Sequence, residues 1–267
     1  MIRMVAIDID GTLLNSQRQV TEAVRAALRR AQDAGLVICL ASGRLIPTLM
    51  PIAMQAGVRG PVVTCNGAYA EMEDGETVFS ARLDPDVEAA LLDYAEEAGI
   101  TANVYQPRRV LCNRESTYLD LYRSRTGGSP LVMTTAELKR EPATKLIFIN
   151  EPEANERDAA HFAAQAAEGK FHLTVSEPIY LEFLPPGVNK GVGVQAVATH
   201  LGLEASEVAA VGDYYNDLEM IEWCGLGAAM ASGAEAVRAA ANMVVPGNDE
   251  DGVAVFLDHI LETRSCI

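Results

Sequence analysis

The sequence is poor in several features that each indicate a definite class of protein. Its five cysteines are widely spaced and form no CxxC pair, so they predict neither a zinc site nor a disulfide framework. Its four histidines lack the spacing of metal ligands. No apolar run approaches the ~18 residues that a membrane span needs. Asp8 and Asp10 interrupt the apolar N-terminus, which therefore lacks the layout of a signal peptide. These absences favour a soluble protein of a reducing compartment, which we expect in the cytoplasm.

Positive charge is also scarce. Lysine and arginine together number 21, against 37 aspartates and glutamates, which gives a formal net charge of -16. A surface this acidic argues against nucleic acid or an anionic membrane as a partner held by bulk charge. It also repels an anionic substrate at long range, so any phosphate site must be made positive locally. At 267 residues, 49% of them hydrophobic, the chain is long enough for one large domain or two smaller ones.

The first eighty residues alternate between strand and helix patterns. Apolar runs, caps and turn signals predict, in chain order, the strand 3–9, the helix 21–34, the strand 36–41, the helix 47–57, the strand 61–65 and the hairpin 68–80. Strands joined by helices predict a doubly wound parallel sheet, in which ligands bind at the carboxyl ends of the strands.

The composition shifts after residue 81. The elements predicted from there onward are the helix 84–99, two strands within 100–112, the strand 145–149, the helix 153–168 and the strands 171–175 and 179–184. The run Leu184-Pro185-Pro186-Gly187 is then a stiff linker that neither strand nor helix can absorb. Beyond it the first pattern resumes, with elements at 190–201, 208–211, 226–230, 242–245 and 249–262. We therefore predict an α/β fold with a core domain, 1–81 plus 185–267, and an inserted α+β cap domain, 82–184.

Polar side chains follow the strands of the predicted core. Asp8 and Asp10 end the first strand, where unpaired charge is costly because a carboxylate must be desolvated. This pair therefore predicts a bound cation or a covalent role. Ser42, Asn66 and Asp213 each follow another predicted strand. Because the carboxyl ends of parallel strands share one edge of the sheet, we expect these side chains to lie close together.

The carboxylates at this edge suit the transfer of a phosphoryl group. Asp8 could attack phosphorus and form an aspartyl-phosphate. Asp10 could protonate the leaving oxygen and later accept a proton from water. That role needs a carboxyl that holds its proton near neutral pH, so we expect desolvation and like charge around Asp10. Asp8 and Asp213, with a backbone carbonyl, form a suitable oxygen set for Mg²⁺.

Other residues could make the site positive enough for phosphate. Ser42 and the amide of Gly43 would bond phosphoryl oxygens at a strand-to-helix turn. Lys190 would supply the positive charge, and Asn216 could donate a further hydrogen bond. Asp217 could orient Lys190 or a metal-bound water, or simply lie in the first turn of a helix, where the dipole favours acids.

Together these residues resemble the four motifs of the haloacid dehalogenase superfamily, present here as Asp8-Ile9-Asp10-Gly11-Thr12, Ser42-Gly43-Arg44, Lys190 and Gly212-Asp213-x-x-Asn216-Asp217. Cys65-Asn66-Gly67-Ala68 and the stretch 212–252 are similar to its Cof-type, sugar-phosphatase-like subgroup. The resemblance covers nearly all of 1–80 and 185–258. It fades across 82–184, where only the size and the α+β pattern match the large C2-type cap of that group.

The resemblance implies a Rossmann-like core and a role for each motif residue. It implies Asp8 as the nucleophile, Asp10 as the acid and base, and Mg²⁺ as the cofactor. The implied metal residues are Asp8, Asp10 through its carbonyl, and Asp213, with Asp217 as a further candidate. The implied phosphate-binding residues are Ser42, Gly43, Lys190 and Asn216, to which we add Arg44 and Asn66 as candidates. Arg44 could contact the substrate or pair with a surface acid.

The resulting hypothesis is a Mg²⁺-dependent phosphatase for a small phosphorylated metabolite, either a sugar phosphate or a phosphorylated cofactor. We expect no nucleic-acid or membrane partner, and a monomer or homodimer. Two alternatives stay open. A phosphomannomutase-like phosphosugar mutase shares this core and cap type, and a non-catalytic receiver would only hold a phosphoryl group on Asp8. The linkers at 80–84 and 184–189 further predict that the cap closes over the site, with specificity set around 105–125 and 170–182.

Overall fold

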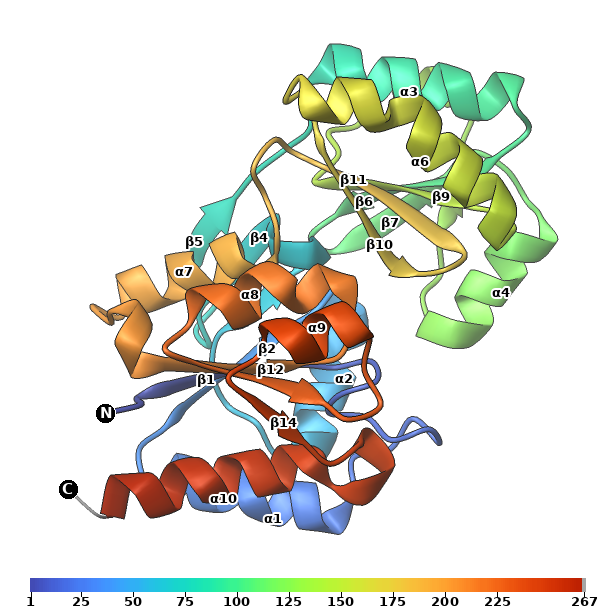
Figure 1. Ribbon diagram of the computed structural model, residues 1–267. Coiled ribbons are helices and arrows are strands. Elements are labelled where there is room, and N and C mark those ends of the chain that lie inside the picture. Colours follow the sequence, from blue (N-terminus) through green and yellow to red (C-terminus); the bar gives the residue numbers. More distant parts are fainter. Residues whose placement is uncertain (266–267) are drawn as a thin grey trace.

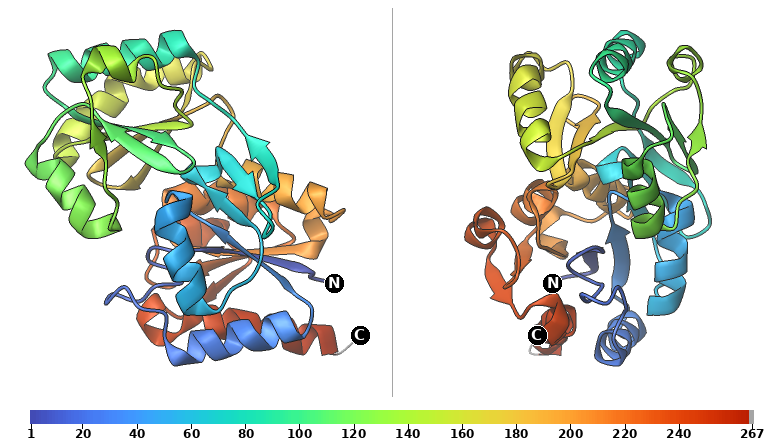
Figure 2. Two further views of the ribbon diagram at one scale, coloured as in Figure 1. Left: turned by 180° about the vertical axis from the view of Figure 1, so that it is seen from behind. Right: turned by 90° about the vertical axis from the view of Figure 1, so that its right-hand side faces the viewer.

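The structure is a computed structural model that describes residues 1–265, and its chain forms two lobes, each built on its own β-sheet (Figure 1). The chain leaves the first lobe after Ser80 and returns to it after Leu184. Both ends of the described chain therefore belong to the first lobe, as the rear and side views also show (Figure 2).

The sheet of the first lobe is mainly parallel. In spatial order its strands are β14 (Met243–Val245), β13 (Leu226–Met230), β12 (Val208–Gly212), β1 (Met4–Asp8), β2 (Val37–Ala41), β3 (Val62–Thr64), β4 (Tyr69–Glu71) and β5 (Thr77–Ser80). Neighbouring strands from β14 to β3 are parallel, and β4 and β5 add an antiparallel hairpin. Ile7 of β1 lies opposite Val211 on one side and Leu40 on the other, and all three are fully buried. Central strands this apolar must be covered on both faces.

Helices supply that cover on both faces of the sheet (Figure 1). One face carries α1 (Glu22–Asp33), α2 (Ile46–Ala56) and α10 (Gly252–Ser265), and the other carries α7 (Lys190–His200), α8 (Leu218–Trp223) and α9 (Glu235–Ala240). This arrangement confirms the doubly wound parallel sheet that the alternation of strands and helices predicted.

The sheet of the second lobe is mainly antiparallel. In spatial order its strands are β10 (His172–Glu177), β11 (Tyr180–Leu184), β9 (Lys145–Ile149), β6 (Thr101–Gln106), β7 (Arg109–Cys112) and β8 (Leu131–Val132). The helices α3 (Pro85–Glu97) and α6 (Pro152–Ala167) cover one face, over a core that includes Leu92, Phe148 and Phe162. The opposite face turns toward the first lobe, where Tyr105 and Ile147 share a buried cluster with Leu45 and Cys65 (Figures 1 and 2).

The second lobe also contains elements that the sequence patterns did not predict. These are α4 (Thr117–Thr126), β8 and α5 (Thr135–Leu138). Helix α4 begins because the Ser116 side chain accepts the N–H of Leu119, and it ends at Gly127, whose φ is 68°. Only Leu119 and Tyr122 of α4 are buried, so its apolar pattern is too sparse to indicate a helix. The core with an inserted α+β unit is confirmed as the fold class, whereas the domain limits at 81/82 and 184/185 stay a prediction.

The structure describes four of the five cysteines and the helices up to residue 265. Cys39, Cys65, Cys112 and Cys224 are buried free thiols, and Cys266 lies outside the described residues. Within residues 1–265, no helix combines the length and the apolar character needed to cross a lipid bilayer.

Candidate active site

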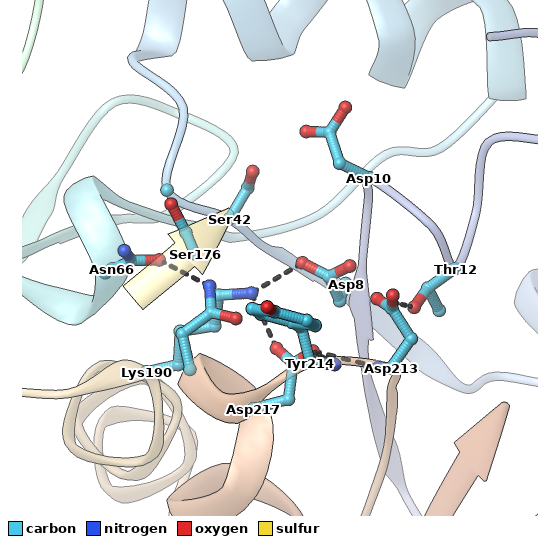
Figure 3. A network of polar contacts seen from close by, with 12 residues as sticks. Asp8, Asp10, Thr12, Ser42, Asn66, Ser176, Lys190, Asp213, Tyr214 and Asp217 are labelled. Carbon is cyan, nitrogen blue, oxygen red and sulfur yellow. Dashed lines mark hydrogen bonds and ion pairs between the residues drawn. The ribbon is translucent and has the colours of Figure 1, made fainter. Parts of the chain in front are cut away.

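The carboxyl ends of neighbouring parallel strands bring the predicted residues to one edge of the first sheet (Figure 3). Asp8 is the last residue of β1, Ser42 follows β2, and Asp213 follows β12. Asn66 lies in the short 3-10 helix η1 (Cys65–Gly67) directly after β3. Their side chains gather near Lys190, as the doubly wound sheet requires.

Lys190 opens α7 and lies among buried carboxylates. The helix begins there because the Asn189 side chain accepts the N–H of Val192 at 3.0 Å. Lys190 Nζ donates to Asp8 Oδ1 at 2.5 Å and to Asp217 Oδ1 at 2.6 Å, and all three side chains are buried. Burial opposes a charged ammonium, but Asp217 and Asp8 outweigh it and raise the pKa of Lys190. Lys190 therefore carries its charge throughout the physiological pH range.

Three carboxylates surround this ammonium. One oxygen from each of Asp8, Asp213 and Asp217 lies within 4.8 Å of the others. Burial and the charge of Asp217 raise the pKa of Asp8 well above its usual range, and the same two causes raise the pKa of Asp213 to about 7. One ammonium does not neutralise three carboxylates, so the cluster has room electrostatically for a further cation. A donor set made only of oxygens fits a hard divalent metal ion.

The position of the Asp213 side chain depends on Gly11 and Thr12, the two residues that follow Asp10. Thr12 Oγ1 donates to Asp213 Oδ1 at 3.0 Å. Gly11 has a φ of 86°, and a Cβ at that position would lie 2.4 Å from Asp213 Oδ2. Both the backbone conformation and the available space therefore require glycine. This positioning role of Thr12 is one that the sequence reasoning missed, although the residue lies inside the first motif.

Asp217 already has protein partners on both of its oxygens. Oδ1 accepts from Lys190, and Oδ2 accepts the backbone N–H groups of Asp213 at 3.0 Å and Tyr214 at 3.1 Å. A carboxylate that accepts three hydrogen bonds has little remaining capacity for a metal ion. Among the alternatives for Asp217, this geometry favours the orientation of Lys190.

Asp10 turns away from the carboxylate cluster (Figure 3). Its side chain is 46% exposed, and its two oxygens each accept a hydrogen bond of 2.6 Å from the guanidinium of Arg44. The expectation of a desolvated, like-charged surrounding for Asp10 was wrong, because the side chain beyond the strand end points outward to a cation. Of the two alternatives for Arg44, pairing with an acid is the one observed here, and the acid is Asp10.

Three further candidate phosphate-binding residues, Ser42, Asn66 and Asn216, are held in place by hydrogen bonds. Ser42 is buried, and its Oγ accepts the backbone N–H of Arg44 at 3.2 Å. Asn216 Nδ2 donates to Asn66 Oδ1 at 3.1 Å, while Asn66 Nδ2 donates to Glu182 Oε2 at 2.6 Å. Asn66 therefore connects Asn216 with the second lobe.

The loop that carries Asn66 has a strained backbone. Cys65, Asn66 and Gly67 all have positive φ values, of 52°, 52° and 94°. At Gly67 a Cβ would lie 1.9 Å from a backbone oxygen of the residue that caps α7, so only glycine fits. Non-glycine residues in this region cost about 1–3 kcal/mol each. Hydrogen bonds from Cys65 N to Arg44 O at 3.0 Å and from Asn66 N to Ser42 O at 3.1 Å hold this loop against the loop after β2.

A cavity of about 380 Å³ opens between the two lobes at this edge of the sheet. The first lobe lines it with the candidate residues Asp8, Asp10, Ser42, Gly43, Arg44, Asp213 and Asn216. The second lobe lines it with residues of β6, α4, β9, β10 and β11. Several of these residues fall within 105–125 and 170–182, the two ranges expected to set specificity. The volume is typical of a site for a small molecule.

Sequence reasoning did not single out Lys145 and Glu182, two charged residues that the second lobe contributes to this cavity, although Glu182 falls within the expected range 170–182. Lys145 begins the apolar strand β9, and Glu182 lies in the middle of the apolar strand β11. Each is a charge within a buried strand, which is the signal that singled out Asp8. Applied to the whole chain, it would have found both residues.

Comparisons with known proteins agree with this geometry. A family model described as haloacid dehalogenase-like hydrolase matches residues 5–257. An HMP-PP phosphatase of Cronobacter sakazakii (strain ATCC BAA-894) is 30% identical over 268 residues, which cover 98% of this chain and 97% of that protein. The chloroplastic endoribonuclease YBEY of Arabidopsis thaliana is 30% identical over 259 residues. That match covers 92% of this chain but 44% of the Arabidopsis protein, so the chain spans less than half of it.

A solved structure supports the same assignment. The crystal structure of a haloacid dehalogenase-like hydrolase from Bacteroides thetaiotaomicron superposes with a TM-score of 0.85 at 26% identity, and the match covers 97% of this chain and 100% of that one. The chain therefore belongs to the haloacid dehalogenase-like hydrolase family, in its Cof-type branch, and is a hydrolase of the phosphatase type.

Proposed function

We propose that this enzyme is a Mg²⁺-dependent phosphatase that hydrolyses a small phosphorylated metabolite through an aspartyl-phosphate on Asp8. The observation that carries the proposal is the environment of the Asp8 carboxylate at the cavity wall. Its Oδ1 is bonded by Lys190 at 2.5 Å, and its Oδ2 accepts no hydrogen bond from any residue between 1 and 265. A carboxylate held in this way has one oxygen free to attack phosphorus.

In the first step, Asp8 Oδ2 forms a bond to phosphorus while the bond from phosphorus to the leaving oxygen breaks. Lys190 offsets the negative charge that gathers on the phosphoryl oxygens. Ser42, the amide of Gly43 and the side chain of Asn216 border the same cavity and donate hydrogen bonds to those oxygens. Asp217 holds the Lys190 side chain in position by accepting its 2.6 Å hydrogen bond.

Asp10 moves the protons in this scheme. It gives a proton to the leaving oxygen in the first step, and it accepts one from the water that attacks the phosphoenzyme in the second. The products are the free alcohol and inorganic phosphate, and both aspartates return to their starting states. This role requires Asp10 to turn from Arg44 toward the leaving oxygen when the substrate binds.

Mg²⁺ fits the residues that surround Asp8. Asp8, Asp213 and the backbone carbonyl of Asp10 would hold the ion, which the excess of carboxylates over ammonium groups supports. When bound, the ion offsets the repulsion between an attacking carboxylate and a phosphate dianion.

The substrate in this proposal is a sugar phosphate or a phosphorylated cofactor. A cavity of about 380 Å³ admits a phosphate joined to a leaving group of that size. The name of the Cronobacter relative, an HMP-PP phosphatase, supports a small phosphorylated compound rather than a polymer.

We also propose that residues 82–184 act as a separate cap that closes over this cavity. We further propose that the enzyme works in the cytoplasm, where its buried thiols stay reduced.

A panel of phosphate esters tests the proposal. We expect the wild-type enzyme to release phosphate with Mg²⁺ and to stop when EDTA is added, while Asp8→Asn is inactive under all conditions. Asparagine keeps the size and the hydrogen bond of Asp8 but removes the nucleophilic charge. Equal phosphate release by wild type and Asp8→Asn would end the proposal. Interconversion of hexose phosphates with little free phosphate would favour the mutase alternative.

A further inference from the structure

We propose that Lys145 and Glu182, two charged residues of the second lobe, are positioning residues for the phosphate-binding loops of the first lobe. The inference rests on the proposed phosphatase function and deepens it. It assigns to the second lobe a part in building the phosphate site itself.

The two residues form a buried ion pair at the junction of the lobes. Lys145 Nζ lies 2.7 Å from Glu182 Oε2, and each side chain is 1% exposed. They lie on neighbouring strands, β9 and β11, among apolar residues such as Leu146 and Phe183. A pair of apolar side chains would stabilise such a site equally well or better, because buried charges lose their hydration. The presence of charge therefore requires a reason other than stability.

Both members of the pair reach into the first lobe. Lys145 Nζ donates to the backbone oxygen of Gly43 at 2.9 Å, and Glu182 Oε2 accepts from Asn66 Nδ2 at 2.6 Å. Gly43 and Asn66 lie next to each other, since a Cβ on Gly43 would lie 3.0 Å from Asn66 Oδ1. One ion pair of the second lobe thus contacts the loop after β2 and the loop after β3 at once.

These two loops carry groups proposed to bind phosphate. The loop after β2 carries the backbone amide of Gly43, one of these groups. In the loop after β3, Asn66 Oδ1 accepts a hydrogen bond at 3.1 Å from Nδ2 of Asn216, whose side chain is another. Asn66 also has a φ of 52°, which an asparagine adopts only at a cost. Without Glu182, the Asn66 amide loses an acceptor and the strained loop loses a restraint. The chain of contacts from Glu182 through Asn66 to Asn216 therefore sets where a phosphate donor lies.

The alternative is that the pair contacts the leaving group, because both residues line the cavity. Their remaining contacts argue against it. Lys145 Nζ lies 4.4 Å from the centroid of the Tyr105 ring, and Glu182 Oε1 accepts from Ser176 Oγ. With Gly43 and Asn66 included, the ammonium and both carboxylate oxygens already have partners within the protein.

Three variants test the inference: Lys145→Met, Glu182→Leu and the double substitution. Binding of inorganic phosphate to the full-length enzyme with Mg²⁺ is measured by calorimetry, and thermal unfolding is followed in parallel. We expect each single variant to lower Tm by roughly 5–10 °C, because it leaves one buried charge unpaired. The double variant recovers most of that loss. It nevertheless binds phosphate about tenfold more weakly, because the loops after β2 and β3 are no longer held in position.

Steady-state kinetics complete the test. In the double variant, we expect kcat/KM to fall by a similar factor for every ester that the wild type hydrolyses. The matched control is Lys139→Met, which breaks a partly exposed ion pair with Asp93 on the same lobe, away from the cavity, and leaves phosphate binding and kinetics unchanged.

Two results would overturn the inference. Wild-type phosphate affinity in the double variant would mean that the pair is structural only. Losses that differ from ester to ester, with phosphate affinity unchanged, would mean that the pair selects the leaving group. Phosphate binding needs no turnover, so failure here is distinct from failure of the Asp8→Asn test. If the single variants do not fold, the double variant alone decides the question.

Discussion

The guanidinium of Arg44 binds both carboxylate oxygens of Asp10, with two nitrogen-to-oxygen distances of 2.6 Å. Paired hydrogen bonds of this kind are among the stronger contacts between charged side chains. They keep the proposed acid and base apart from the cluster around Lys190, while the Asp10 side chain stays 46% exposed and has space to turn. The catalytic contribution of Asp10 can therefore be tested separately from that of Asp8.

Asp10→Asn should slow turnover in a way that depends on the leaving group. Asparagine still offers one oxygen to Arg44, but it has no carboxyl proton to donate. Because loss of the base also slows hydrolysis of the phosphoenzyme for every ester, the quantity compared is kcat/KM, which reports on the first step alone. We expect kcat/KM to fall by about 10²–10⁴ for an alkyl phosphate. The loss should be much smaller for p-nitrophenyl phosphate, whose leaving group needs no proton. Steady-state kinetics on the two esters check this, with Asp33→Asn, an exposed acid at the end of α1 and away from the cavity, as the control. Equal losses on both esters would contradict a role as general acid.

Asp213→Asn and Asp217→Asn should differ in their effect on Mg²⁺. Asp213 has an oxygen in the carboxylate cluster, so its loss should weaken Mg²⁺ binding by about tenfold or more. In Asp217→Asn, either orientation of the amide sets its NH₂ against a donor, Lys190 or the backbone N–H groups of Asp213 and Tyr214. We therefore expect a lower kcat and a lower Tm with a smaller change in Mg²⁺ affinity. Calorimetric titration decides, and an equal loss of affinity in both variants would make Asp217 a ligand.

Mg²⁺ binding should release protons below neutral pH. Burial raises the pKa of Asp213 to about 7, and burial also raises the pKa of Asp8 in the metal-free protein. Below about pH 7 the Asp213 carboxyl holds a proton that a cation must displace, so affinity for Mg²⁺ should rise with pH. Titrations at pH 6 in two buffers of different ionisation enthalpy should give different heats, and the difference should shrink by pH 8.5. Identical heats at pH 6 would exclude proton release.

Glu88 should make the second lobe less stable as the pH rises. It is buried, its Oε2 accepts the N–H of Ala143 at 3.2 Å, and its Oε1 has no partner in the described structure. Burial raises the pKa of Glu88 from 4.5 to about 7. The folded state therefore holds the proton more tightly than the unfolded state. The stabilisation is complete below about pH 4.5 and is lost as the pH rises through about 7.

Glu88→Gln removes this dependence, because the amide is neutral at every pH. At pH 8 we expect the variant to be more stable than wild type, by at most about 3 kcal/mol. Near pH 4.5 the difference should vanish. Urea unfolding at the two pH values measures it, with Glu97→Gln, an exposed position on the same helix, as the control. A difference independent of pH would show that Glu88 does not change its charge in this range.

Much of the first lobe could be predicted because its signals are local. The apolar runs of β1, β2 and β12 and the caps of α1 and α7 lie within a few residues of the elements they define. Residues such as Asp8 and Ser42 follow strand ends directly, and parallel strand ends share one edge. Their proximity therefore follows from the fold class alone.

These local patterns could not predict the direction in which a side chain points. The two residues Asp8 and Asp10 are only two positions apart, yet one faces Lys190 and the other faces Arg44. No periodicity distinguishes them, because the strand ends at Asp8 and the backbone then turns. The polar helix α4 was missed for a related reason, since it buries too little to leave an apolar pattern.

Local patterns in the chain were thus sufficient for the family, for the doubly wound sheet and for the residue types gathered at its edge. They could not identify the buried pair from the second lobe. Lys145 meets Gly43 across 102 positions of sequence, and Glu182 meets Asn66 across 116. Contacts of that range exist only where the two sheets pack against each other. Hydrogen bonding and desolvation at their junction then determine which charges are paired.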